Sequence, residues 1–150
     1  MSYRRATEAD RPAIITLLEQ ANLLTDDLPT DLGTFRLAFA DEKLAGVAGL
    51  EILEENGLLR SVAVSLDFRN QKIGNQLIEV IIELAKSEKI TALYLITTTA
   101  DLYFERLGFT RVDRANVPDN IARTRQFSNL CPVSAVVMSK ELQPQCNSVV

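Results

Sequence analysis

The sequence predicts a mixed α/β domain built around one mostly antiparallel sheet with helices beside it. A chain of 150 residues is about the size of one ordinary domain. Hydrophobic residues make up 47% and charged residues 24%, which is the balance of a globular protein. Apolar residues alternate between strand-like and helix-like spacing along the chain, and that alternation is typical of the α/β class. We expect one domain over residues 1–142 and a flexible tail over residues 143–150.

The first third of the chain predicts a strand, a helix and the start of a meander. Thr7 and Asp10 form a variant of the capping box, with aspartate where glutamate or glutamine is usual. The apolar residues that follow have helical spacing, and a loop rich in Asp, Pro, Thr and Gly comes next. In order, we expect a strand over residues 3–6 and then a helix that includes the apolar positions from Ile14 to Leu23. An irregular loop or a short turn of helix over residues 24–33 follows, and then a hairpin of residues 34–40 with residues 44–53.

The middle of the chain predicts a third strand followed by the longest helix. Asn56-Gly57 is the strongest turn signal in the sequence, and it should join the hairpin to a strand over residues 58–64. After Arg69 the apolar period changes to that of a helix, with Ile73 and Leu77 on its apolar face. Three strands and one amphipathic helix are therefore expected here.

The last third predicts short elements. We expect a strand over residues 91–97, a helix over residues 100–107, a strand over residues 109–114, a helical insertion over residues 119–127, and a last strand over residues 135–138. Gly108 follows the predicted helix and suits its C-terminal cap.

Composition excludes several classes of function. Sixteen basic against 20 acidic residues give a net charge of −4, so we expect no binding to nucleic acid. The chain has no histidine, and Cys131 and Cys146 have no metal-ligand spacing, so no metal site is expected. We find no signal peptide and no apolar run long enough for a membrane span, so a cytoplasmic location without membrane partners is expected.

The segment of residues 58–80 is the most informative part of the sequence. An apolar strand leads into a polar loop, and the loop opens a long helix at Ile73-Gly74. The start of a helix presents unpaired N–H groups and a positive dipole end, which suit a phosphate group. Arg69 and Lys72 add positive charge, and Gly74 permits close approach of the backbone. The alternative is a glycine that merely allows a turn.

Two motifs in this chain resemble a known family. Gln71-Lys72-Ile73-Gly74-Asn75-Gln76 resembles motif A of the GNAT superfamily of N-acetyltransferases, Q/R-x-x-G-x-G/A. The segment Ala100-Asp101-Leu102-Tyr103-Phe104-Glu105-Arg106-Leu107-Gly108-Phe109 resembles the family's A-x-x-x-Y-E-K-L-G-F segment. The resemblance implies the GNAT fold, with the strand of residues 58–64 diverging from that of residues 91–97. It also implies acetyl-CoA as the co-substrate.

The resemblance also implies a set of cofactor-binding positions. Backbone groups of the third meander strand would hold the pantetheine arm, and the loop and helix start would hold the pyrophosphate. The positions implied are Val62, Ala63, Val64, Arg69, Gln71, Lys72, Ile73, Gly74, Asn75, Gln76, Thr97 and Phe104. Three of them depart from the family pattern. Gln76 replaces Gly or Ala, and we expect its side chain to point to water from the outer edge of the helix start. Thr97 replaces an Asn, and Phe104 stands where a tyrosine general acid is frequent.

Acyl transfer to an amine needs a base, a stabilised oxyanion and a proton for the departing thiolate. Glu51, then Glu54, are the candidate bases, and the N–H of Val62 is the candidate oxyanion donor. Tyr103 or Tyr94 are candidate proton donors, with water as the alternative. For Tyr103 a packing role is equally open, and Glu51 could instead be a solvated strand residue.

The candidates for binding the acceptor amine are polar residues near these strands. Arg60 interrupts an apolar run and either binds a substrate carboxylate in the cleft or is an outward edge charge. Arg5 and Arg36 are weaker candidates to assist it.

Several longer phrases, such as GLLRSVAV and FSNLCPVSAVVM, resemble a bacterial subgroup of arsenic-resistance or amino-acid N-acetyltransferases. This implies a small acidic or amino-acid-like amine as acceptor, with Ser61, Thr98 and Cys131 beside it. The alternative for Cys131 is a small buried hydrophobe, which is the more frequent case for such a cysteine.

Two other functions stay open. A degenerate fold that only senses acetyl-CoA or an amino acid is the first, and an enzyme that acetylates protein N-termini or lysines is the second. Relatives are often dimers, so a homodimer is also open.

Overall fold

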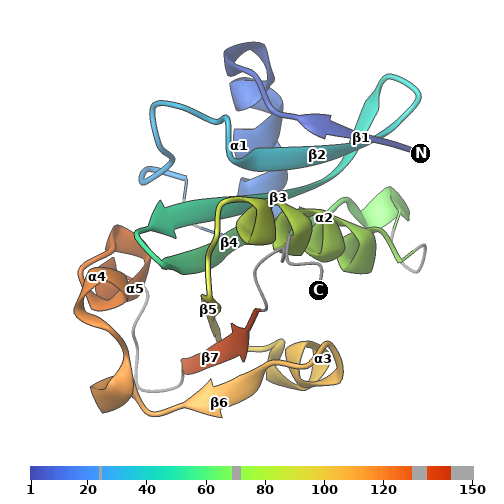
Figure 1. Cartoon of the computed structure of the whole chain (residues 1–150). Coiled ribbons are helices and arrows are strands. Elements are labelled where there is room, and N and C mark those ends of the chain that lie inside the picture. The colour runs from blue at the N-terminus through green and yellow to red at the C-terminus, as the bar shows by residue number, and fades with distance from the viewer. Residues whose placement is uncertain (24, 69–71, 130–134, 143–150) are drawn as a thin grey trace, which may run out of the picture. The chain divides into compact units, whose positions relative to one another are not determined.

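The computed structural model describes residues 1–23, 25–68, 72–129 and 135–142 (Figure 1). The chain forms two compact units, Met1–Leu50 with Ser61–Leu84, and Glu51–Arg60 with Ala85–Val150. The predicted single domain over residues 1–142 stays a prediction, and the predicted tail, residues 143–150, lies outside the described residues. No helix in the described part of the chain has the length and apolar character needed to cross a membrane.

Seven strands form one sheet with the hydrogen-bonded order β1-β2-β3-β4-β5-β7-β6. β4 and β5 pair in parallel, with Asn56–Leu58 beside Ala92–Tyr94, and four further pairs between described strands are antiparallel. The predicted mixed α/β fold with a mostly antiparallel sheet and flanking helices is thereby confirmed. The predicted divergence of residues 58–64 from residues 91–97 stays a prediction.

The first unit contains β1, β2, most of β3, α1 and most of α2. The bounds are β1 Ser2–Arg5, a 3-10 turn Glu8–Asp10, α1 Arg11–Gln20, β2 Phe35–Ala40, β3 Lys43–Leu53, a 3-10 turn Leu66–Phe68, and α2 Ile73–Ser87. β1 pairs antiparallel with β2, and β2 with β3. Figure 1 shows β1 and β2 side by side in blue and cyan. The predicted strand, helix, loop and hairpin are confirmed with shifts of a few residues at their ends.

The core of the first unit lies between α1 and one face of its strands. Ile14, Leu17 and Leu18 of α1 belong to one buried cluster with Leu37 and Val47 of the strands. The opposite face of β3 receives α2, because a Cβ added to Gly46 would lie 2.9 Å from Leu77 Cδ1. Neighbouring strand residues point to opposite faces, so Gly46 and Val47 place the two helices on opposite sides of β3.

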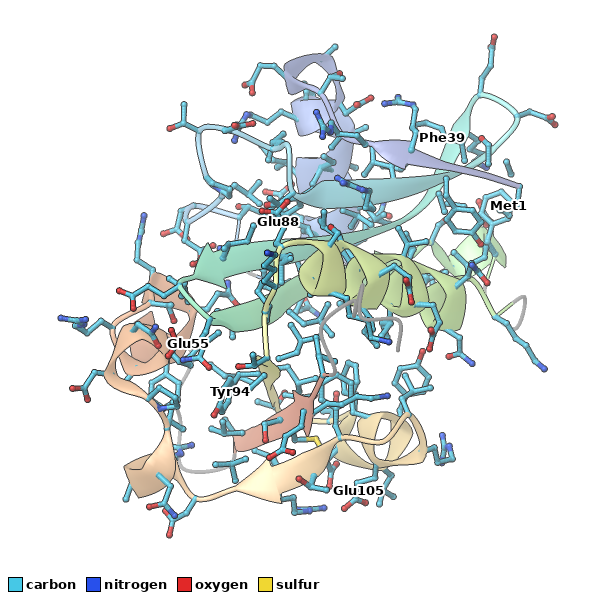
Figure 2. The ribbon with its side chains drawn as sticks, viewed as in Figure 1. Met1, Phe39, Glu55, Glu88, Tyr94 and Glu105 are labelled. Atoms are coloured by element: carbon cyan, nitrogen blue, oxygen red, sulfur yellow. The ribbon has the colours of Figure 1, made fainter. Side chains whose placement is uncertain are left out.

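The start of α1 is held by the predicted capping residues. The backbone N–H of Thr7 donates to Oδ2 of Asp10 at 2.8 Å, and the Thr7 hydroxyl lies 3.0 Å from the same atom. Arg4 adds a two-pronged contact from β1, with Nη1 and Nη2 at 2.9 and 2.8 Å from the two carboxylate oxygens. In Figure 2 Phe39 lies beside β1, and the Arg4 guanidinium sits 4.5 Å from the centre of its ring.

These contacts give a prediction about acid stability. The hydrogen bond from Arg4 and those from Thr7 lower the pKa of Asp10 from 3.8 to about 2. A carboxylate with a lowered folded-state pKa stabilises the protein above the unfolded-state value and loses that contribution as pH falls towards the folded-state value. We expect Asp10→Asn to cost about 1–2 kcal/mol of unfolding free energy at pH 7. Urea unfolding should show this gap closing between about pH 4 and pH 2, and a gap that does not vary with pH would contradict the assignment.

The second unit contains the β3–β4 turn, β5, β6, β7 and the short helices. The bounds are β4 Asn56–Val64, β5 Ala92–Thr97, α3 Asp101–Arg106, β6 Thr110–Val112, a 3-10 turn Arg114–Asn116, α4 Asp119–Ala122, α5 Arg125–Asn129, and β7 Val136–Glu141. β7 pairs antiparallel with both β5 and β6. The predicted helical insertion is confirmed as α4 and α5. Ile121 of α4 is fully buried in a cluster with Leu58 and Val137.

The turn predicted at Asn56-Gly57 is wrong, since the chain turns at Glu54-Glu55 and both predicted turn residues lie in β4. Glu54 takes the left-handed φ of 60°, and Glu55 is labelled at this turn in Figure 2. Tertiary contacts override the local signal. Asn56 and Gly57 pair with β5, and the amide of Asn56 donates to Asn120 Oδ1 at 3.2 Å.

Candidate functional site

The candidate residues divide between the two units. The first unit holds Ser61, Val62, Ala63, Val64, Lys72, Ile73, Gly74, Asn75 and Gln76, and the second holds Glu51, Arg60, Thr97, Thr98, Tyr103 and Phe104. Arg69, Gln71 and Cys131 lie outside the described residues. Each group is described within its own unit.

The end of β4 carries a backbone irregularity at Ser61. This residue is buried and has a φ of 56° inside the strand. A non-glycine residue in the left-handed region is uncommon and, within a strand, interrupts the regular ladder as a bulge does. The following N–H, that of Val62, is thereby turned away from the direction it would have in a regular strand. Val62 is the predicted oxyanion donor, but no local sequence pattern indicates this backbone irregularity.

Ala63 fixes this segment to the core of the first unit. It is 5% exposed and belongs to the cluster formed with α1. Val62 and Val64 are half-buried, and the next residue, Ser65, donates its N–H to the carbonyl of Ala45 at 2.8 Å. The strand end is therefore held against β3 while its backbone follows the irregular course set by Ser61.

The start of α2 lies in the same unit. Lys72 is exposed and has a left-handed φ of 58°, and its carbonyl accepts the N–H of Gln76 at 3.1 Å. The N–H groups of the first helical turn have no carbonyl partner within a helix, and the positive end of the helix dipole lies beside them. Ile73 and Gly74 begin that turn, so the described residues fit a receptor for a phosphate group.

The position of this helix depends on a glycine in β3. A Cβ on Gly46 would lie 3.2 Å from Ile73 Cγ2 and 2.9 Å from Leu77 Cδ1. Ile73 is itself 2% exposed, so its side chain anchors the first turn of α2 on the sheet. Gln76 is exposed, which confirms that its side chain points to solvent despite replacing the family's small residue.

Arg60 and Glu51 form an ion pair in the second unit. Nη1 of Arg60 lies 2.6 Å from Oε1 of Glu51, and the two side chains are 1% and 25% exposed. The interpretation of Arg60 as an outward edge charge is therefore wrong. The Glu51 side chain keeps partial contact with solvent, so its role as the base stays a prediction. Among the described residues no hydrogen bond to Glu51 Oε2 is recorded. Arg60 thus orients the Glu51 carboxylate through Oε1, and Oε2 is the oxygen that can accept a proton from a substrate.

Thr97 ends β5 and supports the start of α3. Its hydroxyl oxygen accepts the N–H of Ala100 at 3.0 Å, so this side chain has a local structural role that an asparagine would also be able to supply. Thr98 follows and is exposed. Gly108 ends α3 with a φ of 95°, which confirms the predicted C-terminal cap.

The aromatic residues of α3 differ in their surroundings. Phe104 is 7% exposed, and its ring meets those of Tyr103 and Phe109 edge to face at 5.2 and 5.6 Å. Burial raises the pKa of Tyr103 above its ordinary value of 10.0, against the opposing effect of Arg106. Tyr103 therefore keeps its proton at neutral pH and can donate it, whereas Phe104 has no proton to give. Burial also raises the pKa of Tyr94.

No group of three or more potential metal ligands occurs in the described part of the chain. The chemistry available to the described candidates is thus that of carboxylate, guanidinium, hydroxyl and backbone N–H groups.

Comparison with known proteins assigns the family. Residues 3–109 match the model of the acetyltransferase (GNAT) family. Among curated relatives, the amino-acid acetyltransferase of Pasteurella multocida is 30% identical over 137 residues, which are 85% of this chain and 30% of the relative. The amino-acid acetyltransferase of Escherichia coli K12 is 30% identical over 145 residues, 91% of this chain and 32% of the relative. The chain spans about a third of the length of these relatives.

Solved structures show the same fold. N-acetylglutamate synthase from Neisseria gonorrhoeae, complexed with coenzyme A and L-arginine, superposes with a TM-score of 0.81 at 23% identity, over 95% of this chain and 33% of that one. A Mycobacterium tuberculosis protein in complex with CoA and NLQ superposes with a TM-score of 0.77 at 21% identity, over 95% and 100% of the two chains. With most of the chain matched by the family model, this protein belongs to the acetyltransferase (GNAT) family.

Proposed function

We propose that the protein is an N-acetyltransferase that moves an acetyl group from acetyl-CoA to the amine of a small acidic or amino-acid-like acceptor. The observation that carries the proposal is the family match over residues 3–109, which includes the strand end at Ser61–Val64 and the start of α2. The names of the curated relatives, amino-acid acetyltransferases, support the class of acceptor.

The transfer is a direct attack in a ternary complex. The amine nitrogen bonds to the thioester carbonyl carbon, the carbon–sulfur bond breaks, and CoA leaves as the thiol after taking up a proton. The N–H groups of Ile73 and Gly74 hold the pyrophosphate, and Arg69, Gln71 and Lys72 contribute beside it. Backbone groups of Val62, Ala63 and Val64 hold the pantetheine arm, and the Val62 N–H stabilises the oxyanion.

Proton transfer is assigned to the second unit. Glu51 accepts the amine proton, directly or through water, at the oxygen that Arg60 does not occupy. Tyr103 carries its phenolic proton at neutral pH, since burial raises its pKa further above the ordinary value of 10.0, and it supplies a proton to the thiolate. Phe104 and Thr97 belong to the cofactor side, where Phe104 contributes an apolar surface.

The residues that contact the acceptor amine are part of the same proposal. Arg60, Ser61, Thr98 and Cys131 are assigned to the acceptor. Because the Arg60 side chain is 1% exposed and bound to Glu51, an acceptor carboxylate would reach its guanidinium only beside Glu51. The proposal has three more specific parts: an arsenic-related acceptor, a cytoplasmic location and a homodimer.

A second candidate is a module that binds acetyl-CoA without turnover. It is favoured by Phe104, which removes the tyrosine hydroxyl of the family pattern and is buried against Phe109. Both candidates require acetyl-CoA to bind, and they differ in whether an amine releases CoA.

Thermal unfolding tests the shared requirement. At about 100 times its Kd, acetyl-CoA should stabilise the folded protein by about 2.7 kcal/mol, a rise in Tm of roughly 5–10 °C for a domain of this size. Desulfo-CoA, which keeps the pyrophosphate, should give a comparable rise, and adenosine, which lacks it, should not. No rise with acetyl-CoA would contradict both candidates.

A further inference from the structure

Two arginines lie directly opposite each other on β1 and β2. Arg5 and Arg36 are Cα partners in the antiparallel register. Residues directly opposite in such a pair extend to the same face of the sheet, where like charges destabilise the pairing. The sequence therefore places two positive charges directly opposite each other in this strand pair.

The environment of Arg36 intensifies this repulsion. Its side chain is half-buried, and burial together with the charge of Arg5 lowers its pKa from the ordinary value of 12.5. Nη1 donates to the carbonyls of Gly33 and Phe35 at 2.8 and 3.1 Å. Within the described residues these are the recorded hydrogen bonds of the side chain, so Nε and Nη2 keep donors to offer.

The contrast with nearby arginines shows that this pair is unusual. Arg4 meets both oxygens of Asp10, and Arg11 meets Glu8 at 2.5 Å. Acidic residues outnumber basic ones by 20 to 16, yet among the described residues no carboxylate is recorded as an ion-pair partner of Arg5 or Arg36. The two carbonyl contacts also fix the Arg36 guanidinium before any ligand arrives, which reduces the entropic cost of binding.

We propose that Arg5 and Arg36 form a binding site for an oxyanion, a phosphate or carboxylate group, where they lie opposite each other on β1 and β2. The planar guanidinium of Arg36 presents its remaining donors to two oxygens of the ligand, and Arg5 contacts the ligand from the opposite strand. A bound anion attracts both guanidinium groups, and these two attractions offset the repulsion between the arginines. The site lies wholly within the first unit and does not depend on the proposed acetyl transfer.

The test is thermal unfolding with inorganic phosphate as the probe, against chloride at matched ionic strength. At about ten times Kd, phosphate should raise the Tm of the wild-type protein by roughly 3–6 °C. Arg5→Gln should equal or exceed the wild-type Tm in chloride, because the repulsion is gone, and should lose the rise in phosphate. Arg36→Lys should lose most of the rise as well, since an ammonium cannot present the planar pair of donors.

The matched control removes an exposed arginine elsewhere. Arg123 of the second unit is exposed and has no recorded ion pair within the described chain, and Arg123→Gln should retain the full rise in phosphate. Succinate as a second probe distinguishes carboxylate from phosphate ligands, and a rise with either one that is lost in Arg5→Gln and Arg36→Lys supports the site. An equal rise in wild type, Arg5→Gln and Arg36→Lys, or no rise with either probe in the wild type, would overturn the proposal.

Discussion

Replacing Glu51 with alanine is expected to lower the free energy of unfolding by about 3 kcal/mol. The change leaves the Arg60 guanidinium, whose side chain is 1% exposed, without the carboxylate 2.6 Å away. Removing one member of a buried ion pair costs about 3–5 kcal/mol. The lower end applies because Glu51 is itself 25% exposed and Arg60 has a further interaction. Urea unfolding of the variant at neutral pH measures the loss.

The chain offers a matched control for this change. Lys43 and Asp67 form an ion pair at 2.9 Å, but their side chains are 64% and 65% exposed. Asp67→Ala should therefore cost no more than about 1 kcal/mol. If Glu51→Ala were no more destabilising than Asp67→Ala, the Arg60 pair would not be the buried electrostatic contact described above.

Replacing Gly74 with valine is expected to weaken acetyl-CoA binding by ~100-fold or more, about 2.7 kcal/mol in binding free energy. Gly74 is the second residue of α2, where a branched side chain would stand over the N–H groups assigned to the pyrophosphate. Valine has a higher helix propensity than glycine, so the loss should not come from an unstable helix. Isothermal titration with acetyl-CoA measures the affinity, and thermal unfolding without ligand checks the fold.

A valine at a later position of α2 is the control. It shows whether the loss of affinity depends on the start of the helix or on any valine in it. Glu79 is exposed on α2, and Glu79→Val should leave acetyl-CoA affinity within about twofold of the wild type. Unchanged affinity in Gly74→Val, with the fold intact, would remove the start of α2 from the cofactor site.

Periodicity in the sequence predicted the elements whose packing agrees with their local pattern. The helix expected after Arg69 appears as α2, and its apolar residues Ile73, Leu77 and Ile81 are all buried. The Thr7 and Asp10 cap was also readable, because its partners are only three residues apart. In these segments the interactions that decide the structure are local, so a single sequence contains them.

The turn at Glu54-Glu55 shows where that reasoning stops. Asn56-Gly57 has the stronger local preference for a turn, but pairing with β5 and the contact with Asn120 draw both residues into β4. Those partners lie 36 or more residues away along the chain, so no window around residue 56 reveals them.

The candidate site was predictable to the extent that it rests on motifs. The start of α2 could be located from Gly74 and its neighbours, and the exposure of Gln76 agrees with the expectation. The left-handed backbone at Ser61 and the pairing of Arg60 with Glu51 depend on strand register and on the position of the turn. A one-residue shift of register reverses the facing of every side chain in a strand, so these features required the structure.

The most direct test of the proposed activity is release of the CoA thiol from acetyl-CoA in the presence of single amino acids and small amino acids bearing a second acid group. We expect release that depends on the amine, saturates with its concentration, and is accompanied by the N-acetylated product in the mass spectrum. Acetyl-CoA that binds but releases no thiol above the amine-free rate with any acceptor of this class would contradict the transferase and leave the binding module in its place.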